Sequence, residues 1–239
     1  MKTKDFTYYT DGISAGSTVV LSQAITLIES SKKEHHQLAQ QIVNYCLPHS
    51  GNSIRIGITG VPGVGKSTFI ESLTADKQEE KIAILAVDPS SLKTGGSILG
   101  DKTRMEKLVA RDNVFIRPSP AGKTLGGVTS KTRETIILCE AAGFDKIIIE
   151  TVGVGQSETA VSRMVDLFIL LILPGSGDEI QGIKRGIVEL ADIIVINKAD
   201  GDREKLANES KRAYRNALHL MTPKYAGWTV PVVTCSALE

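Results

Sequence analysis

The stretch that decides the fold is Gly60-Val61-Pro62-Gly63-Val64-Gly65-Lys66-Ser67. It fits the pattern G-x-x-x-x-G-K-[ST], in which backbone N–H groups and the start of a helix surround a phosphate group. A β-branched run (54–59) precedes it and a helical pattern (66–74) follows it, which is the context that the motif needs. A glycine-rich turn without a ligand is the structural alternative. We predict that a nucleotide is bound by Gly60, Val61, Pro62, Gly63, Val64, Gly65, Lys66, Ser67 and Thr68, with Lys66 on the β and γ phosphates and Ser67 on Mg²⁺.

Around this motif, short β-branched runs alternate with longer amphipathic segments. The runs predict strands at 54–59, 82–87, 114–117, 146–150, 167–173, 193–196 and 230–234. The segments between them predict helices at 66–74, 102–110, 131–142, 158–163, 179–190 and 203–220. This alternation predicts a three-layer α/β fold, with a mainly parallel sheet covered by helices on both faces.

The first fifty residues have a different pattern. Apolar residues recur at helical spacing from Ser17 to Leu47 and are interrupted by the polar stretch 29–36, which predicts two helices joined by a turn. We therefore expect an N-terminal helical extension, 1–50, followed by a phosphate-loop domain, 51–239. In the turn, His35 and His36 are expected to be solvated rather than to bind a metal, because no cysteine or acidic cluster accompanies them.

A second motif, Asn197-Lys198-Ala199-Asp200, follows the predicted strand 193–196 and indicates which base is bound. A carboxylate only accepts hydrogen bonds. Guanine presents two donors, N1–H and N2–H₂, whereas adenine presents an acceptor at N1, so Asp200 predicts guanine. A helix N-cap is the alternative role of this motif. The guanine site is therefore expected to include Asn197, Lys198 and Asp200, with backbone N–H groups of Ser236, Ala237 and Leu238 near guanine O6.

Acidic residues on neighbouring loops predict the metal and switch positions. Asp88 and Asp101 are candidates for binding Mg²⁺ or its waters, because the ion takes few protein carboxylates. Arg104 is a candidate for neutralising phosphate charge, although a helix-surface arginine is as good an explanation. Glu150 ends a buried strand and is expected beside Mg²⁺ or the attacking water, and the Gly153 N–H is expected to sense the γ-phosphate. The predicted catalytic residues are thus Lys66, Asp101, Arg104 and Glu150, and the predicted metal ligands are Ser67, Asp88, Asp101 and Glu150.

The residue at one position predicts slow hydrolysis of the nucleotide. Val154 stands where small regulatory GTPases have a glutamine that orders the attacking water, and the nearest glutamine is Gln156. We expect slow intrinsic hydrolysis that a partner protein completes. A module that holds the nucleotide without hydrolysing it is the alternative.

Composition limits the class of protein. With 41% hydrophobic and 23% charged residues over 239 positions, the chain has the composition of a folded globular protein. The net charge of +1 creates no overall field that would attract nucleic acid or anionic lipid, so neither is expected as a partner. The longest apolar run, 167–173, is short against the roughly 20 residues that span a bilayer. Three cysteines far apart in sequence, and no signal or transit segment, predict a reducing cytoplasmic location.

The sequence resembles a known family. The motifs that carry the resemblance cover nearly all of 50–239 and read GVPGVGKST, AVDPSS, GGSILGDKTRM, RPSPAGKTLGG, IIETVGVGQSE, LPGSGDEIQGIKRGI, NKAD and TCSAL. They are similar to those of the MeaB/ArgK/MMAA family of P-loop GTPases, which are GTP-dependent chaperones of adenosylcobalamin-dependent acyl-CoA mutases, chiefly methylmalonyl-CoA mutase. The resemblance implies that this chain binds and hydrolyses GTP and gates the loading and protection of such a mutase.

The resemblance also implies a switch that relays the nucleotide state to the mutase, at 175–184 with Asp178, Gln181 and Lys184. From its residues alone, that segment predicts only a turn that opens an amphipathic helix. Family members continue past the guanine loop into a helical region that forms a homodimer, and this chain stops at Glu239, so we expect weakened dimerisation.

Two other functions compete with this one. A nickel-insertion GTPase for hydrogenase or urease usually has Cys or His metal-binding sequences, and only His35-His36 is available here. A small-molecule kinase shares the phosphate loop, but the motif at 197–200 argues against it.

Overall fold

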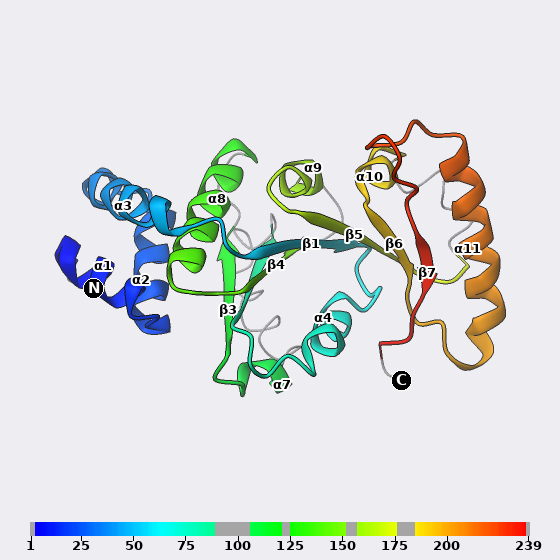
Figure 1. Ribbon diagram of the computed structural model, residues 1–239, viewed down its shortest axis with the longest axis horizontal. Coiled ribbons are helices and arrows are strands. Elements are labelled where there is room, and N and C mark those ends of the chain that lie inside the picture. The colour runs from blue at the N-terminus through cyan, green and yellow to red at the C-terminus, as the bar shows by residue number, and fades with distance from the viewer. Residues whose placement is uncertain (1–2, 89–105, 121–124, 152–156, 176–184, 238–239) are drawn as a thin grey trace. The chain divides into compact units, whose positions relative to one another are not determined.

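The computed structural model describes residues 3–88, 106–120, 125–151, 157–175 and 185–237. Within these residues, seven strands form one sheet in the order β3-β2-β4-β1-β5-β6-β7. Every strand pair with a described register is parallel. The predicted α/β fold is therefore confirmed (Figure 1). In the described part of the chain, no helix is both long enough and apolar enough to cross a membrane.

Two compact units make up the chain. Unit 1 comprises Met1–Arg55 and Lys77–Ile148, and unit 2 comprises Ile56–Asp76 and Ile149–Glu239. Unit 1 contains α1 (Phe6–Ser14), α2 (Thr18–Glu29), α3 (Lys33–Cys46), η1 (Leu47–His49), β2 (Ile82–Asp88), α7 (Glu106–Val109), β3 (Val114–Pro120) and α8 (Leu125–Ala141). Unit 2 contains α4 (Lys66–Thr74), α9 (Ser157–Ser162), β5 (Leu167–Ile172), α10 (Arg185–Leu190), β6 (Ile193–Ile196), η3 (Gly201–Arg203), α11 (Glu204–His219) and β7 (Val232–Thr234). Strands β1 (Ile54–Gly60) and β4 (Lys146–Thr151) begin in unit 1 and end in unit 2. The predicted boundary at residue 50 stays a prediction.

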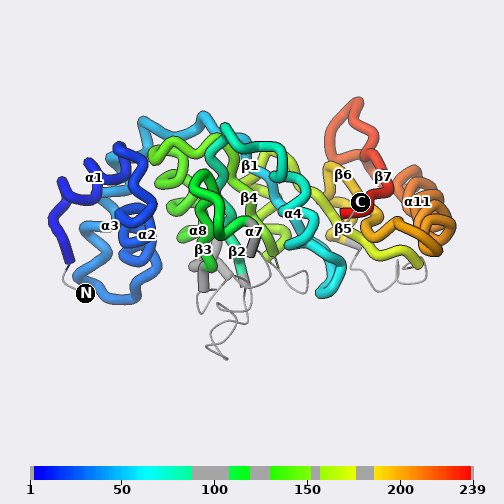
Figure 2. The backbone as a smooth tube through the Cα atoms, turned by 90° about the horizontal axis from the view of Figure 1, so that it is seen from below, coloured from blue at the N-terminus to red at the C-terminus, as the bar shows by residue number. Residues whose placement is uncertain are grey.

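Three N-terminal helices, α1, α2 and α3, pack against one another in unit 1 and lie side by side in both views (Figures 1 and 2). The side chain of Asp5 caps α1 by accepting a hydrogen bond from the Tyr8 N–H, and Ser17 caps α2 in the same way. Helices α2 and α3 correspond to the two predicted helices, whereas α1 was not predicted. Because α3 begins at Lys33, His35 and His36 lie in its first turns and not in the turn that precedes it.

Charged side chains connect the helices of unit 1 to its strands. Glu140 on α8 accepts hydrogen bonds from the Arg55 guanidinium on β1, at 2.9 Å each to Nε and Nη2. The same carboxylate accepts bonds from the Gly51 N–H and the Ser53 hydroxyl. Arg117 on β3 pairs with Glu29 at the end of α2. These pairs attach α8 to the central strand β1 and α2 to the edge strand β3.

In unit 2, the strand register brings the carboxyl ends of four strands to one edge. Gly60 at the end of β1 pairs with Leu171 on β5, and Ile172 pairs with Ile196 at the end of β6. Ile196 in turn pairs with Thr234 at the end of β7. Helix α4 lies on one side of β1 and β5, and α9 and α10 lie on the other (Figure 1). The loops that follow these strands therefore meet at a single edge.

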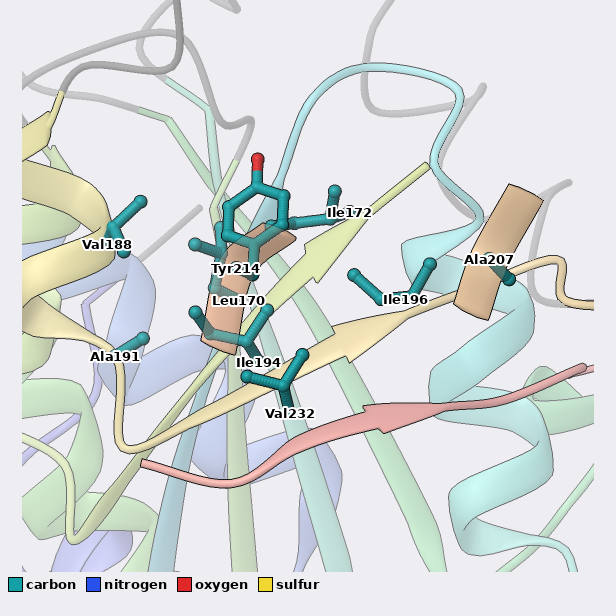
Figure 3. Close-up of a cluster of buried hydrophobic side chains, with 9 residues drawn as sticks. All are labelled: Leu170, Ile172, Val188, Ala191, Ile194, Ile196, Ala207, Tyr214 and Val232. Carbon is teal, nitrogen blue, oxygen red and sulfur yellow. The ribbon is translucent and has the colours of Figure 1, made fainter. Parts of the chain in front are cut away.

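A core of apolar side chains holds this edge in place (Figure 3). Alternate residues of β5 and β6 point toward α10 and α11, and the residues between them are also buried. Because both faces of these strands are covered, their sequences read as continuous apolar runs. The cluster consists of Leu170, Ile172, Val188, Ala191, Ile194, Ile196, Ala207, Tyr214 and Val232.

Several predicted boundaries need correction. Strand β3 continues three residues beyond the predicted end, through Pro118 and Pro120; it is an edge strand, where a missing N–H is tolerated. Helix α8 begins at Leu125 and not at residue 131; the two glycines of its first turn have low helix propensity, which is why the sequence did not predict this start. Strand β7 is two residues shorter than predicted. Among the described residues, the predicted helix 102–110 is represented by α7 alone, and the predicted helix 179–190 by α10 alone.

Candidate nucleotide-binding site

The phosphate-binding motif forms the connection between β1 and α4 in unit 2. The strand ends at Gly60 and the helix begins at Lys66, as the motif predicts. A Cβ atom at Gly60 would lie 2.5 Å from the Leu171 carbonyl oxygen, so only glycine fits beside β5 here. Gly65 is the N-cap of α4 with a left-handed φ of 95° and brings no side chain to cap the helix. No side chain caps the start of α4, an arrangement typical of helix N-termini that bind anions.

Lys66 lies folded back over its own loop. Its ammonium group donates to the Gly60 carbonyl at 2.8 Å and to the Val61 carbonyl at 3.4 Å. The residue is only 8% exposed. A buried cation held by loop carbonyls is a counter-charge already in place for a phosphate group.

The base motif is joined to the phosphate loop by two side chains. The Asn197 Nδ2 donates to the Val64 carbonyl at 2.8 Å, and the Lys198 Nζ donates to the Gly63 carbonyl at 2.8 Å. Asn197 is 1% exposed, and its Oδ1 has no hydrogen-bond partner among the described residues. The two motifs therefore form one structural element, although their first residues, Gly60 and Asn197, are 137 positions apart.

Asp200 lies at the end of this motif with an extended backbone (φ −108°, ψ 153°) and precedes η3. Within the described residues, its carboxylate makes no capping hydrogen bond to that helix. Asp200 thus occupies the N-cap position of η3 without capping it through its side chain, and its role at the base stays a prediction. Lys198 is the one described non-glycine residue with positive φ, at 58°, and this kink turns the chain between Asn197 and Asp200.

The segment after β7 lies against the base motif. The Cys235 N–H donates to the Ile196 carbonyl at 2.9 Å, and the Ala199 N–H donates to the Cys235 carbonyl at 3.0 Å. The hydroxyl of Ser72, on α4, donates to the Ala237 carbonyl at 2.6 Å. The structure thus brings Ser236 and Ala237 to the same edge as the other two motifs, whereas Leu238 lies outside the described residues.

The predicted metal and switch residues are only partly described. Glu150 is half-buried near the end of β4, and Ser67 lies in the first turn of α4. Asp88 ends β2, and nothing is described of its side chain. Outside the described residues lie Asp101, Arg104, Gly153, Val154, Gln156, Asp178, Gln181 and Lys184. Among the described residues, no group of three His, Cys, Asp or Glu side chains could hold a metal ion.

Sequence reasoning missed three polar residues of this edge. The Thr151 hydroxyl, at the end of β4, donates to the Thr59 hydroxyl of β1 at 2.7 Å, and both residues are fully buried. A threonine directly before the phosphate loop is ordinary strand composition, so no pattern indicated this pair. Ser72 likewise belongs to no motif.

Three cysteine thiols are present and none forms a disulfide. Burial raises the pKa of Cys46 to about 11. Burial also raises the pKa of Cys139, and the neighbouring Glu140 carboxylate adds to the effect. Desolvation raises the pKa of Cys235, which is only partly buried. All three thiols are therefore protonated at neutral pH.

Comparison with known proteins places this site in a family. Residues 21–239 match the family model described as methylmalonyl Co-A mutase-associated GTPase MeaB. The chain belongs to the MeaB family. A putative GTPase of Caulobacter vibrioides is 58% identical over 226 residues, which cover 94% of this chain and 69% of the relative. The mitochondrial methylmalonic aciduria type A homolog of Mus musculus is 48% identical over 238 residues, 95% of this chain and 57% of that protein.

A solved structure agrees with the MeaB assignment. The crystal structure of an LAO/AO transport system kinase superposes with a TM-score of 0.82 at 40% identity, over 100% of this chain and 72% of the other. The predicted resemblance to the MeaB/ArgK/MMAA family is confirmed. This member of the MeaB family is thus a GTPase that binds guanine nucleotide.

Proposed function

We propose that this GTPase is a chaperone that gates cofactor loading and protection of an adenosylcobalamin-dependent acyl-CoA mutase, with methylmalonyl-CoA mutase as the client. The family description names an association with that mutase, and the mouse relative is named for methylmalonic aciduria. The observation that carries the proposal is the match of residues 21–239 to this family model. The bonds from Asn197 and Lys198 to the phosphate loop join the two ends of the nucleotide site that the client would respond to.

In this proposal, GTP spans unit 2 along the loop edge. The Lys66 ammonium moves from the loop carbonyls to the β and γ phosphates, and N–H groups of residues 60–68 surround them. At the other end, the Asp200 carboxylate accepts from guanine N1–H and N2–H₂, and Ser236 and Ala237 present N–H groups to O6. Asn197 and Lys198 hold the two ends at a constant separation.

Magnesium is proposed as the metal of this site, and the described donors fit it. The Ser67 hydroxyl and the Glu150 carboxylate are hard oxygen ligands of the kind that Mg²⁺ takes while it keeps several waters. Ser67 follows Lys66 directly in the first turn of α4, where the phosphates are expected. Asp88 and Asp101 are proposed as further ligands, direct or through water. When bound, the ion supplies charge neutralisation at the β and γ phosphates.

Hydrolysis is proposed to rest on positioning and on charge. Lys66 and Arg104 would neutralise negative charge on the phosphates, and Asp101 and Glu150 would order the metal and the attacking water. The γ-phosphate would also order the loops near Asp101, Gly153 and Asp178, and its loss would release them. With Val154 in place of a glutamine, we expect slow turnover until the client completes the site.

Nucleotide-dependent capture of the client tests this proposal. The chain is loaded with GDP or with a non-hydrolysable GTP analogue and used to recover partners from its native host. We expect to recover an acyl-CoA mutase. Its affinity for the GDP-loaded and the analogue-loaded chain should differ at least about tenfold, which corresponds to a coupling free energy of about 1.4 kcal/mol. Lys66→Ala should abolish the difference. Recovery of a hydrogenase or urease subunit, or of no mutase in either state, would contradict the proposal.

A further inference from the structure

Ser72 makes a hydrogen bond that no motif accounts for. It lies on α4, five residues after Ser67, and its hydroxyl donates to the carbonyl of Ala237 at 2.6 Å across 165 positions of sequence. Its neighbour Thr74 behaves differently, since its hydroxyl bonds within the helix, to Ile70 at 2.8 Å. Ser72 therefore reaches out of its helix to the segment that follows β7.

The segment that Ser72 contacts has left the sheet. Strand β7 ends at Thr234, and backbone bonds to β6 and to Ala199 hold Cys235. Ala237 lies two residues beyond these bonds, in a bend. A bond to its carbonyl restricts the orientation of the peptide groups around it, and these include the N–H groups proposed to face guanine O6.

Helix α4 thus contacts both ends of the site. Lys66 and Ser67 stand at its N-terminus, where the phosphates are expected, and Ser72 stands more than one turn further on. An α-helix is rigid over so short a length, with a rise of about 1.5 Å per residue. The helix can therefore set the separation between the phosphate site and the O6 site.

We infer that Ser72 is a positioning residue for guanine recognition, which holds the segment Cys235–Ala237 in the conformation that meets O6. The inference rests on the proposed role of that segment. Its physical basis is preorganisation: a loop ordered before binding loses less conformational entropy when the base arrives.

A nucleotide analogue separates this role from a general loss of structure. In 6-thio-GDP, sulfur replaces O6 and accepts hydrogen bonds weakly, while N1–H, N2–H₂ and both phosphates stay unchanged. Calorimetry would give dissociation constants for GDP and 6-thio-GDP with the unchanged chain, Ser72→Ala, Ser72→Thr and Asn208→Ala. Asn208 is the matched control, because its side chain bonds within its own helix, to the Glu204 carbonyl at 3.1 Å.

We expect Ser72→Ala to weaken GDP binding about five- to tenfold, the range of one lost hydrogen bond, and to weaken 6-thio-GDP binding less than about twofold. Ser72→Thr retains the hydroxyl and should bind GDP within about twofold of the unchanged chain, as should Asn208→Ala. Equal losses for both nucleotides, no loss with Ser72→Ala, or failure of Ser72→Thr to retain affinity would overturn the inference while leaving the proposed loop role intact. Equal affinity of the unchanged chain for both nucleotides would instead refute the role of the loop at O6.

Discussion

The polar interactions that attach helices to strands in unit 1 differ in kind from those that join the loops of the site in unit 2. In unit 1, they join oppositely charged side chains, Glu140 with Arg55 and Glu29 with Arg117, and connect helices to strands. In unit 2, they run from side chains to backbone carbonyls of loops, as from Asn197 to Val64 and from Lys198 to Gly63. The first kind holds secondary-structure elements together, whereas the second kind determines the shape of a loop.

This difference separates stability from function. Breaking a buried ion pair leaves an uncompensated charge, and the cost appears in the free energy of unfolding. Removing a side chain that holds a loop leaves the core intact and changes what the loop can bind. The variants below test that separation, beginning with the largest expected effect.

Glu140→Ala should lower the free energy of unfolding by about 4 kcal/mol, because it removes the buried carboxylate that pairs with the Arg55 guanidinium and accepts from the Gly51 N–H. Denaturant titration measures the change. The Glu140 side chain is 1% exposed, whereas that of Glu34, which pairs with Lys32, is 72% exposed. Glu34→Ala is therefore the control and should cost less than about 0.5 kcal/mol. Equal losses in the two variants would remove the contrast between buried and surface pairs.

Lys66→Ala should lower single-turnover GTP hydrolysis by about 10² to 10³, because the cation that we propose moves to the phosphates is lost. Its cost in stability should stay near 1 kcal/mol, the value of its bond to Gly60. Lys205→Ala, on the exposed face of α11, is the control and should hydrolyse GTP at the normal rate. A loss of stability as large in free energy as the loss of rate would show that Lys66 acts mainly in folding, as the ion pairs of unit 1 do.

Asp200→Asn should weaken GTP binding by about 10², because a charged acceptor facing two guanine donors is replaced by an amide. The same variant should gain affinity for xanthosine triphosphate, whose C2 carbonyl accepts from the new amide. Calorimetry with both nucleotides gives the two values. Asp202→Asn, two residues further along the chain and within η3, should alter neither. Unchanged preference for GTP in Asp200→Asn would exclude Asp200 from the base site.

Gly65→Ala and Gly63→Ala form a matched pair at the phosphate loop. Both positions have positive φ, 95° and 80°, so each substitution costs about 1 to 2 kcal/mol of backbone strain. An added Cβ at Gly65 would also lie 2.8 Å from the Asn197 Nδ2, whereas at Gly63 nothing lies within 4 Å. We expect Gly65→Ala to weaken GDP binding about tenfold more than Gly63→Ala. Equal effects would show that the contact with Asn197 carries no energy.

The smallest expected effect is a difference in the rates at which the three cysteines are alkylated. At pH 8, the raised pKa of Cys46, about 11, leaves only about one thiolate in a thousand, and Cys139 is fully buried. Cys235 is partly exposed and should react first with iodoacetamide, with rates that rise as pH rises toward its pKa. Mass spectrometry identifies the modified residue. Because Cys235 lies beside the base motif, GDP should slow its reaction, and modification of Cys46 first would contradict this order.

Much of this site follows from local chemistry, and so could be predicted. Strands β5 and β6 are compact apolar runs, because both of their faces are buried. The base motif follows β6 directly, so the apolar run indicated where this loop begins. The early start of α8 was missed because Gly126 and Gly127 lower local propensity while tertiary packing keeps the helix. Helix α1 was missed because Phe6–Ser14 contains residues of low helix propensity, such as Thr7, Thr10 and Gly12, although Tyr9 is fully buried.

By itself, the sequence determined the strand–loop–helix around Lys66 and the family, because each depends on a few adjacent residues whose backbone and side-chain chemistry admits few alternatives. The preference of Asp200 for guanine is a prediction from the same local chemistry. Only the tertiary structure decided which loop atoms each side chain meets. The bonds from Asn197 to Val64, from Lys198 to Gly63 and from Ser72 to Ala237 join residues 133, 135 and 165 positions apart. Such pairs depend on strand order and register, which the whole core sets, and no local pattern encodes them.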